Sequence, residues 1–147
     1  MGGSQVLLDV GEVQPFSVLL KSAIVGSAND ASVAIAEALY GSESVFVERM
    51  NERARELGLT DTHFVNCTGL PAEGQQTTAR DVAVMTMAML SYPTYFDFPP
   101  SGWTRWTTRR PHHPTDQHQQ AHPPLRRCDG GKTGSTNEAG YCISATA

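Results

Sequence analysis

Lysine is scarce in this sequence: only Lys21 and Lys132 occur among its 147 residues. Val18 and Asp129 lie three residues before them, so the sequence contains no Ser-x-x-Lys motif. That spacing places a lysine one helical turn from a serine, close enough to activate the serine as a nucleophile. The sequence therefore excludes this form of nucleophilic catalysis within its own residues.

Cysteine is also rare, with Cys67, Cys128 and Cys142 as the three examples. An odd and sparse set does not form a disulfide framework, and no Cys-x-x-Cys pair indicates a zinc site. We expect small buried or free thiols and no metal or other cofactor.

Long apolar runs are missing, and none approaches the length of a membrane span. The opening residues are followed by no basic and then apolar run, so neither a signal peptide nor a membrane anchor is visible. The formal net charge of -4 gives no general attraction to nucleic acid or to an anionic membrane. Apolar residues make up 39% and charged residues 18%, which is ordinary for a globular protein of at most one domain.

Apolar residues recur at helical spacing in four stretches of the first 90 positions, after a short extended arm or strand between Gly2 and Glu12. Local start and stop signals define these helices. The expected boundary residues are Pro15 and Gly26 for the first helix, Asn29 or Asp30 and Gly41 for the second, Ser42 and Gly58 for the third, and Thr78 and Asp81 for the start of the fourth, with Pro93 beyond its end.

The triplet Lys132-Thr133-Gly134 predicts an anion-binding strand. On an extended strand Lys132 and Gly134 face the same side. A lysine there can bind a carboxylate, and a glycine lets a ligand approach the backbone closely. The residues after Gly134 are rich in turn formers, and Tyr141–Ser144 predicts a returning strand. We expect a hairpin that carries this triplet.

A second triplet, Ser27-Ala28-Asn29, lies between two predicted helices. Ser-x-Asn followed by Lys-Thr-Gly gives two of the three signatures of penicillin-binding proteins and serine β-lactamases. Longer stretches resemble the serine D-Ala-D-Ala carboxypeptidases, which are the low-molecular-weight penicillin-binding proteins. These stretches are Gly2–Gln5, Gly26–Glu37, Thr62–Asn66, Thr68–Leu70, Thr77–Asp81 and Gly131–Cys142.

The resemblance implies an acyl-enzyme reaction on peptidoglycan stem peptides that end in D-Ala-D-Ala, with β-lactams as ligands of the intact family. By resemblance, Ser27 and Asn29 take the proton-shuttle and substrate-amide roles. Lys132 and Thr133 would hold the substrate carboxylate and support proton transfer, while Gly134 permits close approach. The backbone N–H of Ser135 would supply half of the oxyanion hole. The family works outside the cytoplasmic membrane, so the resemblance implies an extracytoplasmic location.

The family's nucleophile belongs to Ser-x-x-Lys, upstream of a Gly-Gly-Ser-like segment such as Gly2–Ser4. We therefore expect the part with the nucleophile to be absent, and the activity of these residues alone to be very low or nil. Two alternatives stay open. One is a noncatalytic module that holds a cell-wall peptide through Lys132, and the other is a serine β-lactamase-like or transpeptidase enzyme.

Residues 101–128 contain five of the nine arginines and four of the five histidines. Three interpretations are open: a disordered basic loop, a metal or nucleic-acid patch, or translation in a shifted reading frame. The patch would use histidines whose spacing matches no finger motif, namely His112, His113, His118 and His122. A frame shift would turn Gln117–Arg127 into Asn-Thr-Asn-Lys-Leu-Ile-Arg-Arg-Tyr-Asp-Gly, which resembles the family's segment before the Lys-Thr-Gly strand.

The predicted fold is α+β and β-lactamase/transpeptidase-like, truncated to mainly the helical subdomain plus a C-terminal hairpin. Residues 1–100 form a partial helical subdomain with the Ser-x-Asn loop. Residues 101–128 form the irregular basic segment, and residues 129–147 form the Lys-Thr-Gly hairpin.

Overall fold

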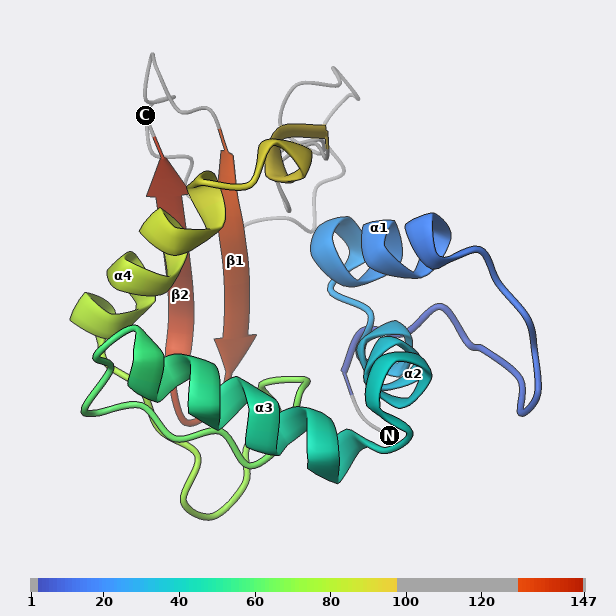
Figure 1. Ribbon diagram of the computed structural model, residues 1–147, viewed down its shortest axis with the longest axis horizontal. Helices are drawn as coiled ribbons and strands as arrows, with labels where there is room; N and C mark the ends of the chain where they lie inside the picture. The colour runs from blue at the N-terminus through green and yellow to red at the C-terminus, as the bar shows by residue number, and fades with distance from the viewer. Residues whose placement is uncertain (1–2, 98–129, 147) are drawn as a thin grey trace, which may run out of the picture.

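The structure, a computed structural model, describes residues 3–97 and 130–146 (Figure 1). Within them, helices come first and a β-hairpin last, which is the α+β composition predicted from the sequence. The predictions for residues 101–128, including the four histidines and the shifted frame, lie outside the described residues. The elements are α1 (Phe16–Gly26), α2 (Asn29–Tyr40), α3 (Glu43–Glu56), α4 (Ala79–Leu90), the 3₁₀ helix η1 (Pro93–Asp97), β1 (Gly130–Thr136) and β2 (Gly140–Thr146).

Two helices, α3 and α4, begin where a short polar side chain accepts a backbone N–H group. The Ser42 hydroxyl accepts the Val45 N–H at 3.3 Å, and the Thr78 hydroxyl accepts the Asp81 N–H at 3.1 Å. Both predicted caps are therefore confirmed. Pro15 lies one residue before α1 rather than at its first position.

The expectation that Asn29 or Asp30 caps α2 was wrong. Ala28 occupies the cap position and no side chain caps the helix there. The Asp30 carboxylate, inside the first turn, instead accepts the N–H groups of Val6 and Leu8 at 3.1–3.2 Å. A tertiary contact has thus taken the carboxylate that local sequence assigned to the helix start.

These bonds hold the N-terminal arm, residues 3–15, which is irregular. The backbone is left-handed at Gly3, Leu7 and Gly11 and no strand forms in residues 3–15, so the predicted strand or extended arm is not formed there. The Asn29 N–H donates to Ser4 O at 2.8 Å, close to the Asp30 contacts. Asp30 therefore fixes the arm against the start of α2, next to the Ser-x-Asn triplet.

Acid is expected to release this arm. Burial raises the pKa of Asp30, but the N–H groups of Leu8, Val6, Ala31 and Leu7 outweigh it and hold the pKa below the ordinary 3.8. A carboxylate whose pKa is lowered on folding stabilises the folded chain at pH values above its ordinary pKa. This stability is lost as the pH falls through the pKa of the folded state. NMR should show the Val6 and Leu8 amide resonances shifting together below pH 3.8.

Asp30→Asn is the control for that titration, since its amide cannot gain a proton in this range. The shared transition should vanish in the variant. If the two amides still titrate together in Asp30→Asn, another group controls the arm and the assignment to Asp30 is wrong.

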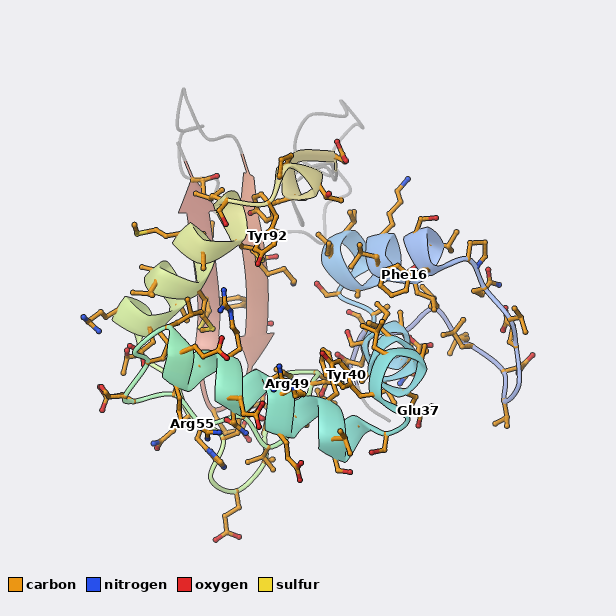
Figure 2. All side chains as sticks on the ribbon, viewed as in Figure 1. Phe16, Glu37, Tyr40, Arg49, Arg55 and Tyr92 are labelled. Atoms are coloured by element: carbon orange, nitrogen blue, oxygen red, sulfur yellow. The ribbon has the colours of Figure 1, made fainter. Side chains whose placement is uncertain are left out.

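A small core joins α1 to α2. Leu19 of α1 packs with Ala28, Ala31 and Ile35, and Leu8 of the arm lies partly buried against them. Two of these are alanines, which allow the helices to approach closely. At the α2–α3 junction the rings of Tyr40 and Phe46 lie 5.6 Å apart, and Figure 2 shows Tyr40 facing α3.

The hairpin packs against α4, and β1 is its strand nearer to α1 and α2 (Figure 1). β1 and β2 are antiparallel, with Lys132 opposite Ser144, so these two side chains share one face of the hairpin. Ser144 bonds Thr86 of α4 through their hydroxyls at 2.6 Å. The buried Asp81 of α4 accepts the Thr62 hydroxyl at 2.7 Å, which ties the preceding loop to the same helix.

Candidate active site

Ser27 lies at the sharp turn between α1 and α2. Its backbone is left-handed, with φ 53° and ψ 35°, an uncommon conformation for a residue with a side chain. The N–H groups of Ser27 and Ala28 both donate to Ser22 O, which fixes the turn. The turn ends α1 and starts α2 two residues later, so Ser27 stands between the helices.

Lys132 of β1 connects the hairpin to this turn through a hydrogen bond. Its Nζ donates to Ser27 Oγ at 2.6 Å, although the two residues are 105 positions apart. The same Nζ donates to Thr133 O at 2.6 Å, which fixes the ammonium from a second direction. Burial lowers the pKa of Lys132. The structure thus joins the two triplets singled out in the sequence, while the roles assigned to them stay predictions.

Asn29 is buried beside the same turn, with 7% of its surface exposed. A Cβ on Gly3 would lie 2.6 Å from Asn29 Nδ2 and 3.5 Å from Leu70 Cδ2, so a side chain at this position would displace the Asn29 amide. The backbone of Gly3 is also left-handed, with φ +77°. Three separated stretches that carried the family resemblance therefore meet around Gly3.

The loop that delivers Leu70 is built around Asn66. The Asn66 side-chain oxygen accepts the N–H groups of Thr68 and Gly69 at 3.2 and 2.8 Å, and its amide donates to Leu70 O at 2.8 Å. Gln75 Nε2 donates to the same Asn66 oxygen at 3.2 Å. One asparagine thus sets the shape of the loop beside the site.

The remaining predicted residues follow Lys132 along β1. Thr133 is half-buried, whereas Gly134 and Ser135 are exposed. A Cβ on Gly134 would meet no atom within 4 Å, so the strand faces open space there. That space is compatible with the close ligand approach predicted for this glycine.

Sequence reasoning missed the requirement for glycine at position 131. A Cβ there would lie 1.9 Å from the backbone oxygen of Ser144 on β2, far inside any real contact. Gly131 therefore permits the strand pairing that positions Lys132. The doublet Gly130-Gly131 was visible in the sequence. The need for glycine at position 131 follows only from the register in which β1 pairs with β2, and the sequence does not give that register. Asp30 was also missed as the anchor of the arm.

Other reactive groups lie apart from this pair. Burial, followed by the nearby Glu43, raises the pKa of the Cys67 thiol to about 12, so the thiol stays protonated and unreactive. Within residues 3–97 and 130–146, no cluster of three or more His, Cys, Asp or Glu side chains could hold a metal ion. No helix in this described part has the length and apolar character needed to cross a membrane.

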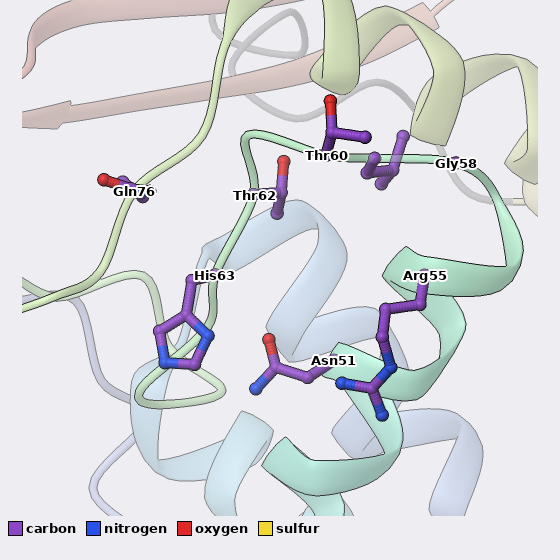
Figure 3. Close-up of a pocket in the computed structure, with 8 residues that line it drawn as sticks. Asn51, Arg55, Gly58, Thr60, Thr62, His63 and Gln76 are labelled. Carbon is purple, nitrogen blue, oxygen red and sulfur yellow. The ribbon is translucent and has the colours of Figure 1, made fainter.

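A separate pocket of about 460 Å³ lies at the end of α3 (Figure 3). Asn51, Arg55 and His63 are among the residues that line it, but Ser27 and Lys132 are not. The Asn51 amide is already engaged, donating to Phe64 O and accepting the Phe64 N–H, both at 2.8 Å. This pocket therefore makes no part of the candidate site.

Comparison with known proteins connects the whole sequence to one family. The model of the D-alanyl-D-alanine carboxypeptidase family (peptidase family S11) matches residues 1–147. The D-alanyl-D-alanine carboxypeptidase DacF of Bacillus subtilis is 40% identical over 156 residues, covering 100% of this chain and 38% of the relative. DacD of Escherichia coli is 34% identical, covering 100% of this chain and 37% of the relative. The chain thus spans less than two-fifths of the length of these relatives.

Solved structures agree on the fold. DacD from Francisella tularensis, a D-alanyl-D-alanine carboxypeptidase, matches with a TM-score of 0.77 and 25% identity, over 100% of this chain and 48% of that one. A Streptomyces K15 DD-transpeptidase matches with a TM-score of 0.75 at 23% identity, over 98% of this chain and 61% of that one. The predicted β-lactamase/transpeptidase-like α+β fold is therefore confirmed.

Proposed function

This chain belongs to the D-alanyl-D-alanine carboxypeptidase family, and we propose that its residues form the substrate-binding side of a serine carboxypeptidase site for peptidoglycan stem peptides ending in D-Ala-D-Ala. The observation that carries the proposal is the 2.6 Å contact between Lys132 Nζ and Ser27 Oγ, which unites the two family triplets. We further propose an extracytoplasmic location, because stem peptides are part of the cell wall.

In the proposed complex the carboxylate of the terminal D-Ala binds the Lys132 ammonium and the Thr133 hydroxyl. An ammonium that is half-buried binds a carboxylate more strongly than one in water, because the surrounding dielectric is lower. The open space at Gly134 lets the peptide approach the strand. Asn29 would receive the peptide amide, and the N–H of Ser135 would face the carbonyl oxygen that becomes an oxyanion.

The absence of Ser-x-x-Lys from these 147 residues favours a second candidate function. The chain would then hold a stem peptide through Lys132 without cleaving it. Both candidates predict peptide binding, and they differ only in turnover. The same proposal includes the binding of β-lactams. It also includes the division of the chain into residues 1–100, 101–128 and 129–147.

Gly134→Ala should weaken peptide binding about tenfold while leaving the melting temperature unchanged. The added Cβ meets no protein atom within 4 Å, so it costs the folded chain little, but it enters the space assigned to the ligand. Fluorescence anisotropy with a labelled peptide ending in D-Ala-D-Ala measures the first effect, and thermal unfolding measures the second.

The matched ligand control is the same peptide with its C-terminus amidated. It keeps every side chain and lacks only the carboxylate, so its binding should be weak and insensitive to Gly134→Ala. Equal affinity for the acid and the amide would show that Lys132 does not bind the carboxylate, and the proposed function would then be wrong.

A further inference from the structure

We propose that Ser27 and Lys132 form a serine–lysine dyad, in which Ser27 is itself a nucleophile that activated acyl esters can acylate. This activity goes beyond the proposed peptide binding, and it assigns to Ser27 a covalent role that the family resemblance does not imply. It also does not depend on recognition of D-Ala-D-Ala, so either proposal can fail alone.

The geometry meets the requirements for an activated nucleophile. Such a site needs a hydroxyl within about 2.6–3.2 Å of a base, and a third group that orients the base. Ser27 Oγ and Lys132 Nζ are 2.6 Å apart, and Thr133 O holds the same Nζ at 2.6 Å. Lys21, the other lysine of the sequence, is exposed on α1 and offers no comparable pair.

The backbone at Ser27 also fits a nucleophile. A non-glycine residue in the left-handed region is strained, and such strain concentrates at functional sites. Here the strained residue ends α1 and directs its hydroxyl to the lysine of a strand that is distant in sequence. A merely structural turn at this position would be better served by glycine, as at Gly41, which ends α2 with φ +80°.

The lysine lies in surroundings that favour its neutral form. Burial lowers the pKa of Lys132, so its free amine forms more readily than that of a lysine surrounded by water. In the protonated state Nζ donates to Ser27 Oγ. Once Nζ loses a proton, the direction of this bond reverses and the hydroxyl donates to the amine, which is the arrangement of a general base.

The proposed step is a simple acyl transfer. Ser27 Oγ attacks the acyl carbon of p-nitrophenyl acetate, and its proton passes to the neutral Lys132 Nζ. The new Oγ–C bond forms as the bond to the aryl oxygen breaks, which releases p-nitrophenolate. Lys132 holds the transferred proton as an ammonium and then loses it to solvent, which restores the neutral amine. Water hydrolyses the acetyl ester on Ser27 to acetate and a proton, both released to solvent, and the serine hydroxyl is restored.

The test treats the full 147-residue chain with p-nitrophenyl acetate and follows p-nitrophenolate release together with the intact mass. Proteolytic mapping then locates the acetyl group, and hydroxylamine removes it from a serine ester but not from a lysine amide. The expected product is a hydroxylamine-sensitive acetyl group on Ser27.

Substitutions at Ser27 and at Lys132 test the roles of the two residues separately. Ser27→Ala and Ser27→Gly should both lose Ser27 acetylation, and glycine suits the left-handed backbone, so this variant should fold. Lys132→Arg keeps the positive charge but cannot act as a base, and it should slow acetylation of Ser27 by about 100-fold or more. Ser17→Ala and Lys21→Ala, which change an exposed serine and an exposed lysine on α1, should react like the parent chain.

Three results would overturn the dyad. The acetyl group could map to Lys132 as a hydroxylamine-resistant amide, Ser27 could react no faster than Ser17, or Lys132→Arg could react at the parental rate. Loss of peptide binding without loss of acetylation would instead contradict the proposed function and leave the dyad intact.

Discussion

The 147-residue chain, assayed by itself, is expected to release D-Ala from a stem peptide about 10⁶-fold more slowly than a carboxypeptidase such as its Bacillus subtilis relative. Removal of the nucleophile of a serine hydrolase has an effect of about this size. The sequence contains no Ser-x-x-Lys, and substrate binding alone does not supply an acyl-enzyme. The rate of D-Ala release, measured with an enzyme-coupled assay, tests this directly.

The Ser27–Lys132 dyad does not change that expectation, because an amide is a far poorer acyl donor than a p-nitrophenyl ester. Any residual D-Ala release should disappear in Ser27→Ala, while Ser17→Ala should retain it. D-Ala release by the parent chain at a rate close to that of the relative would contradict the reasoning from the missing motif.

Local signals in the sequence were sufficient for most helix boundaries. Ser42 and Thr78 cap their helices as predicted, because a hydroxyl that meets an N–H three residues later depends only on nearby residues. Asp30 has the same capability, but the N–H groups of Val6 and Leu8 take its carboxylate. A cap and a tertiary anchor look alike in sequence, so only the fold distinguishes them.

The sequence predicted which two triplets belong to the candidate site, but not how they are arranged in space. Two signatures in the right order indicated that Ser27 and Lys132 belong together. The 2.6 Å contact itself depends on how α4 places the hairpin and on how Ser22 fixes the turn at Ser27. The left-handed conformation of Ser27 could not be foreseen either, because serine rarely adopts it and no local residue demands it.

Gly131→Ala should unfold or displace the hairpin, with a loss of stability of about 2–4 kcal/mol. The new Cβ would lie 1.9 Å from Ser144 O and 2.9 Å from its carbonyl carbon. Both are backbone atoms of the paired strand, so no side-chain rotation relieves the clash. The φ of +155° at this position adds strain for any residue with a side chain. Thermal unfolding and amide exchange across β1 and β2 measure the loss.

Gly134→Ala is the matched control, because it adds the same methyl group to the same strand where no atom lies within 4 Å. It should preserve the melting temperature and the slow exchange of the hairpin amides. Gly131→Ala should in addition remove Ser27 acetylation, because displacement of β1 separates Lys132 Nζ from Ser27 Oγ. If both glycine variants melt alike and keep acetylation, the pairing of Lys132 with Ser144 is not the register that positions the lysine. The contact between Lys132 and Ser27 would then have to arise from a different strand alignment.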